Sequence, residues 1–143
     1  MTYFRAVDPF PLESPEQTKL HEFYEYLAAG RLVTTACRGC RRRDWPPRGF
    51  CPECGSDQFD WSDLPHEGLL HAFTVQETGV PAGFDKPLIF GITRLDELRI
   101  FTRIIETEPA ELAVGKRVQF TPLRVTDDHE GKPRYLPAFK LVE

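Results

Sequence analysis

The sequence has few of the residues and motifs on which catalytic sites are built. Its only serines are Ser14, Ser56 and Ser62, and none lies in a Gly-x-Ser-x-Gly elbow. Neither a Gly-x-Gly-x-x-Gly fingerprint nor a P-loop occurs, so the standard nucleotide cradles are missing. The 4 histidines are scattered along the chain, where packing or surface roles explain them more simply than general-base catalysis. The chain is therefore not predicted to be a catalyst on its own.

Long apolar runs and an excess of basic residues are also lacking. No run approaches the roughly 18 apolar residues that a membrane span requires. Residues 1–14 mix charged and aromatic side chains and lack the apolar core of a secretion signal, so we expect a cytoplasmic protein. The formal net charge of −4 argues against a general nucleic-acid surface, and 143 residues suffice for one compact domain or a small domain with a satellite.

All 4 cysteines lie close together, at Cys37, Cys40, Cys51 and Cys54. The spacing C-x2-C-x10-C-x2-C is typical of a tetrahedral zinc site, because each C-x2-C turn places two sulfurs on one side of the metal. Two disulfides or a rubredoxin-like iron site are the alternatives, and a reducing cytoplasm disfavours the disulfides. Four thiolates fill the coordination shell, so the metal is predicted to be structural.

Positive charge is concentrated around these cysteines. Residues 31–50 contain six basic residues and one acidic residue, and four of the arginines lie between the cysteine pairs: Arg41, Arg42, Arg43 and Arg48. They either offset the negative charge of a tetrathiolate metal site or bind phosphate groups, which guanidinium groups hold in a bidentate manner. The sequence leaves both interpretations open.

A helix is predicted over residues 15–29. Ser14-Pro15-Glu16-Gln17 has the pattern of a helix start, with a Ser cap, a first-turn Pro and a Gln that completes a capping box. Gly30 is placed to end the helix. Its apolar stripe consists of Leu20, Phe23, Tyr24, Leu27 and Ala28. This stripe packs either on the protein's own core or, because it carries large aromatic side chains, partly against another protein.

From residue 68 onward, the sequence is typical of short β-strands separated by Gly, Pro and Asp. The expected strands are residues 68–78, 88–94, 98–105, 116–125 and 135–142. A hairpin at 93–97, a surface loop at 80–87 and a helical turn at 109–112 fit between them. Five short strands with an interruption after the third favour a closed barrel of the OB type over a small sandwich.

Three aromatic residues distinguish two functional interpretations of this barrel. We expect Phe73, Phe90 and Phe101 to be core residues of alternating strands. On the rival interpretation the chain is a single-stranded nucleic-acid-binding module, in which such rings stack on bases. The fold is thus predicted to be mainly β, with an N-terminal helical segment (1–30), a rubredoxin-like zinc ribbon (31–66) and a five-stranded OB-fold barrel (67–143).

The segment Pro46-Pro47-Arg48-x-x-Cys51-Pro52-x-Cys54-Gly55-Ser56, with the helix before it and the barrel after it, resembles a known family. This is the family of small zinc-ribbon plus OB-fold proteins that accompany thiolase-like enzymes and were long catalogued as a domain of unknown function. The chain departs from its pattern at Arg41, where the family usually has Gly after the second cysteine. We expect a looser first turn there, without loss of metal binding.

The resemblance implies a non-catalytic accessory subunit that binds coenzyme A (CoA) thioesters. Its partner would be a thiolase, a hydroxymethylglutaryl-CoA synthase or a thiolase-fold aldolase of lipid or steroid metabolism, which carries the reactive residues for thiolysis, condensation or retro-aldol cleavage. This chain would complete the CoA or acyl channel. Its structural Zn²⁺ would be held by the four cysteines, and the four arginines named above are the candidates for the CoA phosphates.

Overall fold

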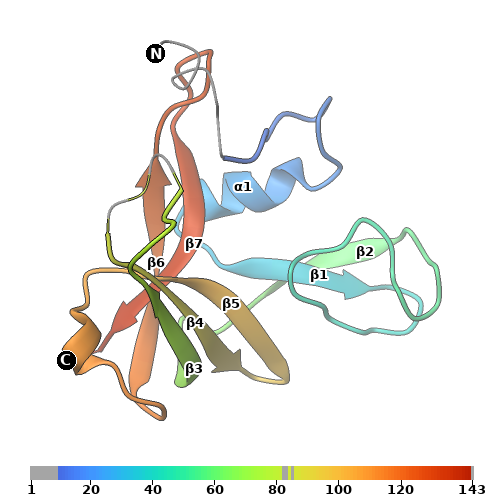
Figure 1. Cartoon of the computed structure of the whole chain (residues 1–143). Coiled ribbons are helices and arrows are strands. Elements are labelled where there is room, and N and C mark those ends of the chain that lie inside the picture. Colours follow the sequence, from blue (N-terminus) through green and yellow to red (C-terminus); the bar gives the residue numbers. More distant parts are fainter. Residues whose placement is uncertain (1–9, 82–83, 85, 143) are drawn as a thin grey trace.

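The computed structural model describes residues 10–81, 84 and 86–142. Most of the segment 1–14 and part of the predicted loop 80–87 lie outside the described residues. The elements are α1 (His21–Ala28), β1 (Val33–Cys37), β2 (Phe59–Asp63), β3 (Glu67–Gln76), β4 (Leu88–Leu95), β5 (Leu98–Ile104), η2 (Pro109–Glu111), β6 (Arg117–Val125) and β7 (Arg134–Leu141). Figure 1 shows a barrel from which the β1–β2 arm projects, with α1 lying beside β7. No helix of the described part is long and apolar enough to cross a membrane.

The barrel is closed, with the strand order β3-β4-β5-β7-β6 and β6 paired back to β3. All neighbours are antiparallel except β5 and β7, which pair in parallel through Arg103–Ala138 and Ile104–Phe139. The five predicted strands are confirmed to within two residues at each end, and the one-turn helix lies between β5 and β6 as expected. The closed topology excludes the sandwich alternative and matches an OB-type barrel.

One hydrophobic core joins the helix, the base of the arm and the barrel. It includes Phe23 and Leu27 of α1, Leu32 and Val33 at the start of β1, and Leu64 directly after β2. These residues pack in the same cluster as the interior side chains of the barrel. The base of the arm is therefore fixed by apolar packing, whereas its far end carries the cysteines.

The helix begins later than predicted, at His21. The carbonyl of Ser14 accepts hydrogen bonds from the N–H groups of Gln17 (2.9 Å) and Thr18 (3.1 Å), which form an isolated turn. The helix N-cap is Leu20, and no side chain caps it. The predicted capping box at Ser14 is therefore wrong.

Packing explains where the helix forms. A first turn is costly to nucleate in water, and residues 14–17 are exposed, so no burial compensates for that cost. In the described part of this segment, regular helix is found where Phe23 and Leu27 reach the core. The predicted end is confirmed, because Gly30 follows the helix with a φ of 80° and its N–H donates to the carbonyl of Leu27.

The prediction that the barrel aromatics are core residues is wrong. Phe101 is 57% exposed and Phe73 is 38% exposed. Phe90 is half-buried and stacks on Phe101, with ring centroids 5.2 Å apart. Successive side chains of a barrel strand alternate between its inner and outer faces. In β5, Ile100 and Ile104 are buried on the inner face, so Phe101 lies on the outer face.

Candidate metal centre and the arginines around it

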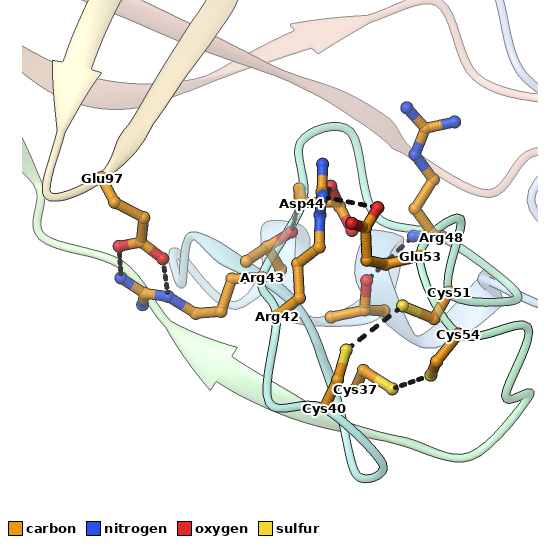
Figure 2. A network of polar contacts seen from close by, with 12 residues as sticks. Cys37, Cys40, Arg42, Arg43, Asp44, Arg48, Cys51, Glu53, Cys54 and Glu97 are labelled. Carbon is orange, nitrogen blue, oxygen red and sulfur yellow. Dashed lines mark hydrogen bonds and ion pairs between the residues drawn. The ribbon is translucent and has the colours of Figure 1, made fainter.

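The four cysteines meet at the far end of the β1–β2 arm (Figure 2). Cys37 ends β1, and the other three lie in the loop between the strands. All four Sγ atoms lie within 4.8 Å of one another, and the pairs Cys37–Cys54 and Cys40–Cys51 are each 3.5 Å apart. Four sulfurs about 2.3 Å from a central zinc ion would stand about 3.8 Å apart. The donor set therefore fits a structural zinc ion, and the sulfurs are too far apart for disulfides.

The two cysteine turns have the same backbone geometry. In the first, the N–H of Arg41 donates to the carbonyl of Cys37 at 2.8 Å, and in the second, the N–H of Gly55 donates to the carbonyl of Cys51 at 2.9 Å. Arg41 (φ 65°) and Gly55 (φ 77°) both have left-handed backbone. The expected loosening at Arg41 is therefore absent from this geometry, and the arginine adopts the conformation that glycine favours.

Backbone amides prepare one sulfur for metal binding. The Cys40 amide, with smaller contributions from the Cys54 thiol and the Gly39 amide, lowers the pKa of the Cys37 thiol to about 6. At Cys40 the Arg42 amide favours the thiolate, but the contact with the Cys51 sulfur and burial raise the pKa to about 12. A divalent cation removes this conflict, because a metal-bound thiol loses its proton outright.

The structure separates the four predicted phosphate-binding arginines. Arg43 points away from the cysteines toward the barrel (Figure 2), where its Nε donates to Glu97 at 2.8 Å and its Nη2 lies 3.1 Å from Asp96. This contact lowers the pKa of Glu97. The same guanidinium donates to Ser62 of β2, so Arg43 links the arm to the β4–β5 hairpin.

Arg42 is also held by carboxylates of this chain. Its Nε lies 2.9 Å from Asp44 and its Nη1 lies 3.2 Å from Glu53. By contrast, the side chains of Arg41 and Arg48 are exposed and have no ion-pair partner among the described residues. Sequence reasoning identified the arginines but missed Asp96 and Glu97, because no local pattern places the β4–β5 hairpin beside the arm.

Comparison with known proteins gives consistent results along the chain. Residues 25–60 match the family model described as "ChsH2, rubredoxin-like zinc ribbon domain", and residues 61–121 match "ChsH2, C-terminal OB-fold domain". The benzoylsuccinyl-CoA thiolase subunit BbsA of Thauera aromatica is 32% identical over 137 residues, covering 92% of this chain and 94% of that protein.

Two further proteins are similar to this chain. A DUF35 domain-containing scaffold protein of Methanocaldococcus jannaschii is 27% identical over 117 residues, covering 78% of this chain and 82% of that protein. Among solved structures, the Ltp2-ChsH2(DUF35) aldolase has a chain with a TM-score of 0.72 and 23% identity, covering 94% of this chain and 98% of that chain. That structural likeness concerns the fold.

Proposed function

The chain belongs to the ChsH2 family of zinc-ribbon and OB-fold proteins, also called DUF35, and from this membership we propose that it is an accessory subunit of a thiolase-like enzyme. In this role it binds acyl-CoA and supports a partner chain that carries the reactive residues. The reaction makes or breaks a carbon–carbon bond, as in thiolysis, condensation or retro-aldol cleavage, and we place it in lipid or steroid metabolism in the cytoplasm.

One observation carries this proposal. The 32% identity with a protein named as a thiolase subunit extends over 92% of this chain and 94% of that subunit. The sequence similarity therefore extends over the helix, the cysteine arm and the barrel, and is not confined to one domain that occurs in many unrelated proteins. A subunit role is the function that this relation supports best.

We further propose that Cys37, Cys40, Cys51 and Cys54 hold a structural Zn²⁺ ion. All four ligands come from the protein, so the metal has no open position for water or substrate, and its role is to fold the loop between β1 and β2. The loop in turn presents the arginines. Zinc is therefore required for the CoA contacts, because it folds the loop that carries the arginines, but it takes no part in the reaction.

For the CoA phosphates, the unpaired arginines are the stronger candidates. Arg41 and Arg48 have no carboxylate partner among the described residues, and their guanidinium groups are available for bidentate contacts. Arg42 and Arg43 remain candidates only if a ligand displaces Asp44, Glu53, Asp96 or Glu97. We therefore propose that Arg41 and Arg48 contact phosphate, while Arg43 holds the arm against the barrel and Arg42 stabilises the cysteine loop.

The test is co-expression with thiolase-like chains encoded in the same genome, followed by co-purification and assays on CoA thioesters. The expected result is a stable complex whose activity exceeds that of the partner alone. An R41A/R48A double variant should raise the KM for the CoA thioester while the complex persists, and R117A, in the barrel, is the matched control. Full activity and stability of the partner without this chain would contradict the proposal.

A nucleic-acid-binding module is the second candidate, and the exposed aromatic pair Phe90–Phe101 is the observation that favours it. Exposed rings on an OB barrel can stack on bases. The net charge of −4 is unfavourable for such binding. A titration with single-stranded DNA and RNA at increasing salt decides between the two candidates: tight binding with a steep salt dependence would support this one.

A further inference from the structure

An apolar pocket lies where α1, the Trp45–Pro47 segment of the cysteine loop and the outer face of β5 and β7 meet. Its volume is about 430 Å³, within the range of small-molecule sites. Its walls are mainly aromatic and aliphatic, and they include Leu20, Phe23, Tyr24, Trp45, Phe101 and Leu136. The pocket is thus built by all three parts of the chain.

The positive charge of one arginine that lines this pocket is not balanced by a carboxylate that the structure describes. Arg99 lines the pocket and is exposed, and no hydrogen bond or ion pair satisfies its guanidinium group among the described residues. Its direct cross-strand neighbour in β4 is Arg94, which is also exposed and also without a partner in the described part of the chain. Like charges directly opposite each other on a sheet are destabilising, so this pair calls for an anion.

Other exposed arginines of the barrel are paired. Arg117 lies 2.8 Å from Glu67, and Arg124 lies 3.1 Å from Asp127. Arg94 and Arg99 are therefore the exposed arginines without a partner in the described part of the barrel, and they lie on the part of the outer face beside the apolar pocket. An apolar cavity with unbalanced positive charge at one wall is complementary to an amphipathic anion.

We propose that this pocket binds an organic anion with a compact apolar body, such as an aryl or alicyclic group, and a single carboxylate. The apolar body fills the space between Phe23, Trp45 and Phe101, and the carboxylate accepts hydrogen bonds from Arg99, with Arg94 adding charge. The site goes beyond the proposed function, because it requires neither CoA nor a partner chain.

The experiment is isothermal titration calorimetry of the full chain with 2-naphthoate and with 2-naphthylmethanol, which has the same ring system without the charge. Naphthoate should bind about tenfold or more tightly than the alcohol, because a charge-assisted hydrogen bond is lost with the carboxylate. Arg99→Gln should abolish this preference. Arg117→Gln, at an exposed and paired arginine outside the pocket, should leave it unchanged.

A second variant locates the site. Leu20→Trp fills the pocket from the helix side and should abolish naphthoate binding, with thermal unfolding as the check on folding. Equal affinity for the two probes, an unchanged preference in Arg99→Gln, or unchanged binding in a folded Leu20→Trp would each overturn the proposal. So would absence of naphthoate binding up to millimolar concentration, which would leave a side chain of another protein as the occupant. None of these measurements involves CoA or a thiolase-like chain, so their failure leaves the proposed function standing.

Discussion

Among single residues, Arg41 and Gly55 allow a matched comparison, since they occupy the same position in two equivalent turns. Both have positive φ, and a Cβ added at Gly55 would meet no atom within 4 Å. Gly55→Ala should therefore cost about 1 kcal/mol through backbone strain alone. Arg41→Ala keeps a Cβ in the same conformation and should change stability by less than about 0.5 kcal/mol. Urea unfolding of the metal-loaded proteins measures both, and equal effects would contradict the assignment of strain.

Glu13 provides a residue-scale prediction of pH dependence. Its side chain is 5% exposed, one carboxylate oxygen has no hydrogen-bond partner among the described residues, and the Lys132 ammonium is 3.5 Å away. Burial raises the pKa of Glu13 above its ordinary value of 4.5, despite the opposing effect of Lys132. The folded protein therefore keeps this proton to a higher pH than the unfolded chain does.

The sign of the effect follows from proton linkage. As pH rises from about 4.5 through the pKa of folded Glu13, the folded state loses the proton that it binds more tightly, so this group's contribution to stability falls. Glu13→Gln lacks this titration and should gain stability relative to the wild type between about pH 4 and pH 7. Thermal unfolding over that range measures the difference between two proteins with the same cysteine cluster. If the stability difference between Glu13→Gln and the wild type did not change with pH, burial of the Glu13 charge would not be the cause of that difference.

The fates of Arg42 and Arg43 show what the sequence can predict about side chains. Cysteine spacing predicted a four-sulfur cluster because the metal imposes its own geometry on nearby residues. The ion pair of Arg43 joins residues 54 positions apart, and only the folded barrel brings Glu97 there. Contacts of this kind depend on tertiary structure, so a local charge pattern could not distinguish a ligand-binding arginine from one already paired.

At the scale of elements, strands were predicted better than the helix. In β5, buried Ile100, Thr102 and Ile104 alternate with outward residues, and this period sets the strand limits. The same alternation does not reveal which face is inside, so Phe101 was assigned to the wrong one. For α1, the Ser14 pattern satisfied the rules for a cap, but propagation of a helix depended on packing that the pattern does not contain.

The β1–β2 arm should depend on its metal more than the barrel does. A two-stranded sheet is marginally stable by itself, and the segment 38–58 is held between its strands by the cysteine cluster. We expect about one zinc ion per chain by elemental analysis. Removal of the metal by a chelator should increase hydrogen exchange in 38–58 while β3–β7 stay protected. Equal loss of protection in the barrel would contradict this division, and a coloured protein containing iron would show that the metal is different.

For the whole molecule, Arg43 and Glu97 form a link between the arm and the barrel. Arg43 is mostly buried and its guanidinium contacts both carboxylates of the β4–β5 turn. Arg43→Glu should lower the free energy of unfolding by about 1–2 kcal/mol, because repulsion replaces a bidentate ion pair. Adding Glu97→Arg should restore part of this loss, and a double-mutant cycle by urea unfolding measures the coupling.

Arg38 provides the control for this cycle. Its ion pair with Asp60 lies within the arm, and both side chains are more than half exposed. Arg38→Glu should therefore change stability by less than about 0.5 kcal/mol. If the effects of Arg43→Glu and Glu97→Arg simply add, the contact does not couple the arm to the barrel, and the apolar core alone fixes their arrangement.

The shared core has a consequence for how such proteins can recombine. The two family models meet between residues 60 and 61, inside β2 (Phe59–Asp63). A chimera joined there would combine half a strand from each parent and would set Leu32 and Val33 of one lineage against Leu64 and the barrel side chains of another. Exchange of either module alone would therefore disturb this packing, so substitutions in the helix, the arm and the barrel have to be compatible with one another.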